Sequence, residues 1–271
     1  MRAPVAALGA VVLTVSLLVA PSAQAAPAPA QVSRATQKKW DQSFAALRKR
    51  LSGPASVSVT GLGRRADEIH VGSTQRMSAW STIKIPISMA ALRRSKSATT
   101  KNRVNRALRH SDNGAAAQLW RQLGSGRIAA KRTNSVLRKY GNKATSTQWR
   151  TVRAGASPYG QTKWSSVGQS YLMAGIACDR EGIYIRRQLN AATSGYWGLR
   201  RFDKAYVKNG YGPRKGGALV RQVAIVVGKD GRRWGVSISI RASSTNRGFT
   251  DASIVTDWLR KRIRQVPAKK C

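Results

Sequence analysis

Ser81-Thr82-Ile83-Lys84, Ser111-Asp112-Asn113 and Lys208-Asn209-Gly210 are three short motifs that occur in this order along the chain. The first motif opens an apolar run over residues 83–92, and the last ends a short strand-like segment. Each motif is short enough to occur by chance, so a single match carries little information. It is their order, together with the segments around them, that indicates one common site.

The spacing of Ser81 and Lys84 suits nucleophilic catalysis. On a helix, residues three apart share one face. A serine hydroxyl is a weak nucleophile at neutral pH and needs a nearby base, and with only two histidines in the chain the candidate base is the Lys84 amine. Burial and a neighbouring cation such as Lys208 would lower its pKa as this role requires. A motif standing alone would better be interpreted as a helix cap and a surface cation; the two partner motifs favour catalysis.

Together the motifs resemble the active-site set of the serine β-lactamases and penicillin-binding proteins, and of class A β-lactamases in particular. Trp197-Gly198-Leu199, before the third motif, and Arg221-Gln222-Val223, after it, extend the resemblance over roughly residues 55–262. The resemblance implies a serine hydrolase that forms an acyl bond between its serine and a β-lactam or a peptidoglycan peptide.

The resemblance assigns a role to each residue of the first two motifs. Ser81 is the expected nucleophile and Lys84 the expected base. Ser111 is expected to relay a proton to the leaving nitrogen, and Asn113 to hydrogen-bond the substrate amide. Asp112 is expected to point inward as a support. The other interpretation of Ser111-Asp112-Asn113 is a plain helix cap, because these residue types are the preferred capping residues.

The third motif is expected to bind the substrate. Lys208 would attract a substrate carboxylate, and Gly210 permits close approach of a ligand to the backbone. The backbone N–H groups of Ser81 and Tyr211 would form the oxyanion hole. Asn209 stands where the family usually has Thr or Ser. An amide donates a hydrogen bond but does not relay a proton as a hydroxyl does, so this substitution weakens the expectation of carboxylate recognition.

One catalytic group of the class A β-lactamases has no counterpart in the sequence. Those enzymes activate the hydrolytic water with a glutamate in the long loop after the second motif. This chain has only Glu68 and Glu181, and residues 114–178 contain no acid. Gln148 lies where the glutamate would be sought, but an amide is not a base. We therefore expect slow deacylation and poor β-lactamase turnover.

The N-terminus is typical of a signal peptide over residues 1–25. A basic start at Arg2 precedes an apolar stretch over residues 5–20, and Ala23-Gln24-Ala25 matches a signal peptidase site. The stretch is too short to be a good membrane span. Residues 26–32 are predicted to be a flexible leader. The sequence therefore predicts a secreted protein, possible cell-wall association, and no transmembrane anchor in the mature chain.

The charge is strongly positive, with 49 Lys and Arg against 10 Asp and Glu and a net charge of +39. Such an excess gives the surface a strong positive potential. For an exported protein the expected partners are anionic polymers of the cell envelope. Nucleic acid is the usual partner at such a pI, but the sequence shows no nucleic-acid-binding motif, and export argues against it. A cationic surface with no specific ligand is the remaining alternative.

These observations leave two functions open. The first is an exported serine acyl-enzyme with slow deacylation, acting on β-lactams or cell-wall peptides. The second is a catalytically inactive β-lactamase-like scaffold that binds anionic envelope polymers through its cationic surface; Asn209 and the missing loop glutamate favour it, because a fold does not fix a function. No cofactor is expected for either, and the protein is expected to be a monomer.

Cys178 and Cys271 are compatible with one disulfide in an oxidising compartment. The alternative is one buried thiol and one free terminal thiol, and the sequence does not decide between them. A metal site is not expected, because His70 and His110 have no ligand spacing with these cysteines.

Periodicity predicts an α/β fold of the α+β sandwich type. The resemblance to the serine β-lactamases implies a β-lactamase-like architecture. An antiparallel sheet is built from both ends of the chain and flanked by helices, and a helical lobe is inserted over roughly residues 81–195 of a single domain covering residues 33–271. The predicted helices cover residues 33–51, 83–92, 113–123, 168–177 and 252–263. The predicted strands cover residues 56–60, 69–71, 222–227 and 234–240, and residues 141–168 are predicted to be an irregular loop.

Overall fold

The computed structural model describes residues 1, 32–63, 67–193 and 195–271. The predicted signal peptide and leader lie outside the described residues, apart from Met1 and Val32. Within the described residues, no helix has both the length and the apolar character needed to cross a membrane.

The centre of the fold is a five-stranded antiparallel sheet with the order β2-β1-β7-β6-β5. Its strands are β1 (Ala55–Gly61), β2 (Glu68–Gly72), β5 (Ala205–Arg214), β6 (Gly217–Val227) and β7 (Arg233–Ala242). The N-terminal strand β1 pairs directly with the C-terminal strand β7, with Val57 opposite Ile238. A two-stranded sheet, β3 (Met77–Ser78) with β4 (Lys163–Trp164), lies beside it. The predicted sheet built from both chain ends is confirmed.

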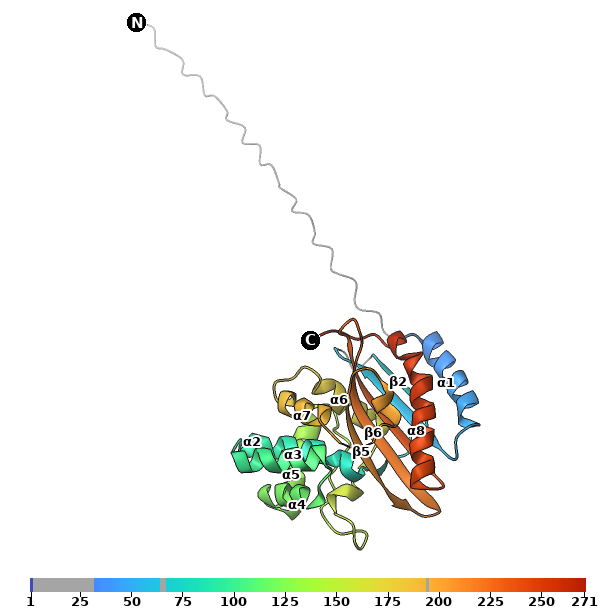
Figure 1. Cartoon of the computed structure of the whole chain (residues 1–271). Helices are drawn as coiled ribbons and strands as arrows, with labels where there is room; N and C mark the ends of the chain where they lie inside the picture. The colour runs from blue at the N-terminus through green and yellow to red at the C-terminus, as the bar shows by residue number, and fades with distance from the viewer. Residues whose placement is uncertain (2–31, 64–66, 194) are drawn as a thin grey trace.

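Two terminal helices, α1 (Arg34–Arg48) and α8 (Thr245–Arg260), cover one face of the sheet (Figure 1). Their apolar sides meet through the rings of Trp40, Phe44 and Trp258, which pack edge to face. Aromatic pairs of this geometry contribute beyond the area they bury. The predicted terminal helices therefore form, although α8 begins seven residues before the predicted 252–263. Ser244 caps its N-terminus by accepting a hydrogen bond from Arg247 N at 3.2 Å.

The other face of the sheet carries α6 (Ser166–Gly175) and the helical lobe. We define the lobe as α2 (Lys84–Arg94), α3 (Ala98–Arg109), α4 (Asn113–Gln122), α5 (Gly126–Lys139) and α7 (Gly182–Asn190). Short 3₁₀ helices connect the parts: η1 (Trp80–Ile83), η2 (Tyr159–Gln161), η3 (Gly198–Arg201) and η4 (Ile263–Gln265).

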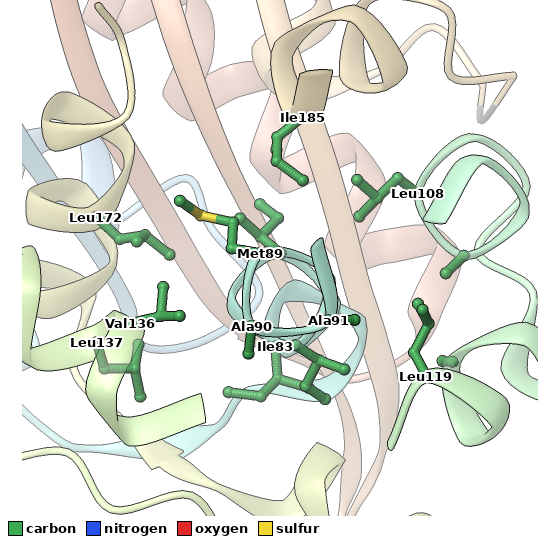
Figure 2. Packing of buried hydrophobic residues seen from close by; sticks show 14 of the residues in the cluster. Ile83, Met89, Ala90, Ala91, Leu108, Leu119, Val136, Leu137, Leu172 and Ile185 are labelled. Carbon is green, nitrogen blue, oxygen red and sulfur yellow. The ribbon is translucent and has the colours of Figure 1, made fainter. Parts of the chain in front are cut away.

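Helix α2 is the central helix of the lobe. Figure 2 views it end-on, surrounded by Leu108, Leu119, Val136, Leu172 and Ile185 from five other helices. Its apolar residues face all directions, which is the pattern of a helix buried on every side. Pro86 lies in its first turn, where a missing N–H is tolerated. A buried and rigid α2 fixes the direction in which its first residue, Lys84, projects.

Three helices were missed by the sequence analysis: α3, α5 and α7. Each has many Lys or Arg residues and only a narrow apolar stripe, as in α3, where Val104, Ala107 and Leu108 are buried. The packing of that stripe against α2 and α4 stabilises a helix whose mean hydropathy is low but whose apolar residues lie on one side. The predicted irregular loop over residues 141–168 also contains η2 and β4.

Cys178 and Cys271 form a disulfide, with their Cα atoms 5.5 Å apart. The bond ties the C-terminus to the segment that follows α6. Nearby, Trp234 Nε1 donates a hydrogen bond to Val266 O at 2.8 Å, which also holds the C-terminal segment against β7.

Candidate active site

The candidate nucleophile lies where β5 meets η1. Ser81 is half-buried in η1, one residue after Trp80, whose φ of 49° is in the left-handed region. A Cβ on Gly210 would lie 2.9 Å from Ser81 N, and one on Gly212 would lie 2.6 Å from the Trp80 ring. A side chain at 210 would therefore clash with backbone, whereas one at 212 would displace the Trp80 ring. The close approach that we expected Gly210 to offer to a ligand is made, in this structure, to the backbone around Ser81.

Lys84, at the start of α2, is buried with 2 % of its surface exposed. Its Nζ donates hydrogen bonds to the carbonyl oxygen of Ser111, to Asn113 Oδ1 at 2.8 Å and to Ser111 Oγ at 3.3 Å. Burial lowers the pKa of Lys84 to about 8, and the charge of Asp112 offsets part of this shift. A fraction of the Lys84 amine is therefore neutral near pH 7, as a general base requires.

A second buried amine lies on the other side of Ser111. Lys208 Nζ donates to Ser111 Oγ at 2.9 Å and to Asn209 O at 3.3 Å. Burial lowers the pKa of Lys208 well below its usual value, and the cations Lys84 and Arg200 lower it further. Ser111 itself has a φ of 54°, an uncommon conformation for a residue with a side chain. Such local strain is typical of sites where the surroundings fix a functional geometry.

The Ser111 hydroxyl is positioned to give up its proton. Its oxygen accepts hydrogen bonds from both Lys84 and Lys208, which uses both of its lone pairs. The hydroxyl proton therefore remains to be donated to a third group, the function that a proton relay to a leaving nitrogen needs.

Ser81 does not pair with Lys84 in this structure. Among the described residues, no hydrogen bond joins Ser81 Oγ to any partner, because the Lys84 amine is turned toward Ser111 and Asn113. Catalytic hydrogen bonds are often long in the absence of substrate, so this geometry alone does not exclude Lys84 as a base. The structure thus joins four predicted site residues in one hydrogen-bonded cluster, Lys84, Ser111, Asn113 and Lys208, and places Ser81 at its edge.

Asn209 belongs to a different network. It lies opposite Gln222 in the register of β5 and β6, and its Oδ1 accepts a hydrogen bond from Gln222 Nε2 at 2.8 Å. Gln222 Oε1 in turn accepts from Leu199 N at 2.6 Å. Asn209 Nδ2 is buried and has no acceptor among the described residues. The amide therefore keeps a donor available, in place of the hydroxyl that the family usually has.

Three aromatic rings lie next to the third motif. The ring of Phe249 stacks on the ring of Trp197, with their centroids 4.2 Å apart, and packs edge to face with Tyr211, with centroids 5.2 Å apart. Tyr211 is 52 % exposed, so this end of β5 presents an apolar surface to solvent. Phe249 is a residue that the sequence analysis did not select, because nothing in the pattern of α8 distinguishes it.

The expectation that Asp112 points inward is wrong. Its carboxylate accepts a hydrogen bond from Ala115 N at 2.9 Å, which caps α4, and another from Arg106 Nε at 2.8 Å. These contacts lower the pKa of Asp112, the Ala115 N–H most of all. The capping interpretation therefore holds for this residue, while its neighbours Ser111 and Asn113 contact Lys84.

No carboxylate among the described residues contacts Ser81. Glu68 accepts a hydrogen bond from Tyr171, and Glu181 pairs with Arg93 and Lys139. Gln148 is folded back on its own loop, where its Oε1 accepts from the N–H groups of Trp149 and Arg150 at 2.9 and 3.1 Å.

Arg200, in η3, is a further basic residue of the site that the sequence analysis missed. Its Nε and one terminal nitrogen are buried without a partner among the described residues, and burial lowers the pKa of its guanidinium. It also contributes to the lowered pKa of Lys208. Its position directly after Trp197-Gly198-Leu199 is the one signal that pointed to it.

Searches by sequence return nothing: no family model matches the chain, and no curated protein does either. Solved structures do match. A variant of the TLA-1 extended-spectrum β-lactamase has a TM-score of 0.68 at 12% identity, covering 84% of this chain and 98% of its own. The class A β-lactamase from Mycobacterium abscessus has a TM-score of 0.64 at 20% identity, covering 82% and 98%. A β-lactamase from Sphaerobacter thermophilus has a TM-score of 0.65 at 14% identity, and the match covers 84% of this chain and 99% of its own. The chain therefore has a serine β-lactamase-like fold.

Proposed function

We propose that this protein is an exported serine acyl-enzyme that acts on β-lactams or on peptide-like amides of the cell wall. The observation that carries the proposal is the placement of one hydroxyl, Ser111 Oγ, between the buried amines of Lys84 and Lys208. A structural role does not require two lysines in a buried cluster that contains no carboxylate, because their mutual repulsion and desolvation destabilise the fold.

In the proposed reaction, neutral Lys84 takes the proton from Ser81 Oγ as that oxygen attacks the amide carbonyl. The N–H groups of Ser81 and Tyr211 stabilise the negative oxygen that forms. When the carbon–nitrogen bond breaks, Ser111 gives its proton to the leaving nitrogen and regains one from the Lys84 ammonium. The products are an ester on Ser81 and a free amine, so all protons are accounted for.

We propose that the substrate carries a carboxylate close to the scissile amide. Lys208 and the unpartnered Arg200 place positive charge at one end of the site, and Asn209 Nδ2 supplies a buried donor. A substrate carboxylate would raise the pKa of Lys208 and satisfy these donors.

The acyl-enzyme is proposed to be long-lived. Hydrolysis of the ester needs a base to deprotonate water, and the carboxylates of the described residues make their contacts elsewhere. The loss of a positioned general base typically slows such a step by about 10²- to 10⁴-fold.

The test is incubation with a fluorescent penicillin, with Ser81→Ala as the matched variant. A labelled wild-type protein and an unlabelled variant are expected. If the wild type stays unlabelled after hours, the proposal that Ser81 is acylated is wrong. The second candidate function, an inactive β-lactamase-like scaffold, then takes its place. The observation that favours this second candidate is that Ser81 Oγ makes no hydrogen bond to Lys84.

A further inference from the structure

A cavity of about 1190 Å³ lies beside the candidate active site, with Trp80, the neighbour of Ser81, in its lining. It is lined by α5, by the two strands β3 and β4, by residues 146–153 and by the ends of β5, β6 and β7. Trp80 lines the cavity, whereas Ser81, Lys84, Ser111 and Lys208 do not. The volume exceeds the roughly 300–1,000 Å³ that is typical of a pocket for one small ligand.

All charged residues that line this cavity are cationic. Eight Lys and Arg residues contribute to it, including Arg127, Lys131 and Arg138 of α5, and none of the ten carboxylate residues of the chain does. None of these eight residues forms an ion pair with another described residue. Clustered like charges with no counter-charge create a strong positive potential inside a concave surface.

Several of these cations are held in place without being neutralised. Arg76 donates to Ala144 O at 2.7 Å, and Arg153 donates to Pro213 O at 2.8 Å. Arg241 donates to Gln75 Oε1 at 3.0 Å. Carbonyl acceptors fix the position of a guanidinium but leave its charge, so the cavity presents ordered positive groups.

Two buried N–H donors of the lining have no acceptor. Gln161 is 8 % exposed, and its Nε2 has no partner among the described residues; the same holds for Trp80 Nε1. A buried donor without an acceptor destabilises the folded protein. Both nitrogen atoms are closed off from solvent, so the groups that a ligand in the cavity reaches directly are the exposed cations of the lining.

We infer that this cavity binds a stretch of a linear polymer that carries an oxyanion, phosphate or carboxylate, on successive units. Arginine and lysine recognise both groups through charge-assisted hydrogen bonds. Nucleic acid fits less well, because Trp149, a half-buried ring of the lining, already carries the guanidinium groups of Arg127 at 5.2 Å and Arg150 at 4.5 Å from its ring centroid. The inference holds whether or not Ser81 is acylated.

The test compares two double variants that remove the same charges from different helices. Arg127→Gln with Lys131→Gln removes two exposed cations, four residues apart, from α5 at the cavity. The matched control, Arg34→Gln with Lys38→Gln, removes an exposed arginine and lysine with the same spacing from α1, on the far side of the sheet (Figure 1). Glutamine is a good helix former, so both helices are expected to persist.

Binding is measured by fluorescence anisotropy with three probes, labelled polyphosphate, poly-L-glutamate and oligothymidylate, over a series of salt concentrations. For the tighter of the first two probes, we expect the cavity variant to bind about tenfold more weakly, with a log–log salt slope smaller by about 1.4, for two lost contacts at about 0.7 each. The control variant is expected to stay within about twofold of wild type. The tighter probe tells phosphate from carboxylate.

Equal losses in both variants would mean diffuse surface binding and would overturn the inference, as would no loss in either. Oligothymidylate binding that exceeds both other probes and depends on Arg127 and Lys131 would replace the partner with single-stranded nucleic acid. Labelling by fluorescent penicillin is measured on the same variants and is expected to be unchanged. A failure of acylation and a failure of polymer binding are therefore separate results.

Discussion

Ser111 Oγ accepts a hydrogen bond from the buried Nζ of Lys208 at 2.9 Å. This contact joins the helical lobe to β5, because Ser111 directly precedes α4 and its cap, whereas Lys208 lies in the sheet. The two halves of the proposed site are thus connected by one hydroxyl, and a change at that hydroxyl affects the chemistry without removing the nucleophile.

Replacement of Ser111 by alanine is expected to slow acylation by about 10²- to 10⁴-fold, the usual contribution of a positioned proton donor. The measurement is the rate of labelling by fluorescent penicillin under single-turnover conditions. Ser135→Ala, at an exposed serine of α5, is the matched control and is expected to label at the wild-type rate. A Ser111→Ala protein that labels as fast as wild type would remove Ser111 from the mechanism.

The rate of acylation is expected to depend on pH through Lys84. Because its pKa is lowered to about 8 by burial, the neutral amine that can accept a proton becomes scarce below that value. The rate is therefore expected to fall about tenfold for each pH unit below about 8 and to level off above it. A rate that is constant between pH 6 and pH 8 would exclude Lys84 as the base.

Lys208→Met is expected to make the folded protein more stable at pH 7 by about 1–3 kcal/mol, because a buried amine without a carboxylate partner is replaced by an apolar chain of similar length. The folded pKa of Lys208 lies below its usual 10.5, so the unfolded chain binds more protons between the two values. Wild-type stability therefore rises with pH over that interval, and the advantage of the variant shrinks toward pH 10.5. Urea unfolding at pH 7 and pH 10 measures both. A variant less stable than wild type at pH 7 contradicts this account of the site.

Gln148→Glu is expected to leave the lifetime of the acyl-enzyme within about threefold of wild type. A glutamate that acted as the general base for deacylation would instead shorten that lifetime by about 10²-fold or more. The side chain at this position is folded onto Trp149 and Arg150 and lines the neighbouring cavity. A chromogenic cephalosporin is expected to give a burst of about one equivalent with either protein. Rapid release from the variant would show that this loop lies over the acyl carbonyl.

Removal of the disulfide by Cys271→Ser is expected to lower the free energy of unfolding by about 2–4 kcal/mol, because the bond closes a long loop in the unfolded chain. Urea unfolding of the variant measures this loss. Cys178→Ser and the double variant are expected to lose the same amount, and a larger loss in the double variant would mean that the cysteines stabilise the fold separately.

The parts of the fold that the sequence predicted are those with strong local signals. The predicted strands at residues 222–227 and 234–240 form within β6 and β7, which a hairpin at Lys229-Asp230-Gly231 joins, with Gly231 at a φ of 84°. The apolar run after Ser81 forms α2. Helices α3, α5 and α7 were not predicted, although each has a one-sided apolar stripe, because the polar and charged residues around that stripe lower the mean hydropathy of the segment.

The site was predicted only in part for a similar reason. Order in the sequence indicated that Lys84, Ser111 and Lys208 belong together, but the distances that make Ser111 their common acceptor come from the packing of the lobe on β5. The local pattern at Asp112 left helix capping and an inward support both open, and the contact with Ala115 N decides for the cap. Arg200 lowers the pKa of Lys208, which is distant in sequence from the first two motifs, and only its place after Trp197-Gly198-Leu199 pointed to it.

The central claim is that Ser81 becomes covalently acylated, and intact-mass analysis with peptide mapping tests it most directly. After incubation with a penicillin, we predict a mass increase of one penicillin per protein, carried by the peptide that contains Ser81, absent from Ser81→Ala and persisting for hours. A wild-type protein of unchanged mass, or a label that maps to any other residue, would contradict the claim.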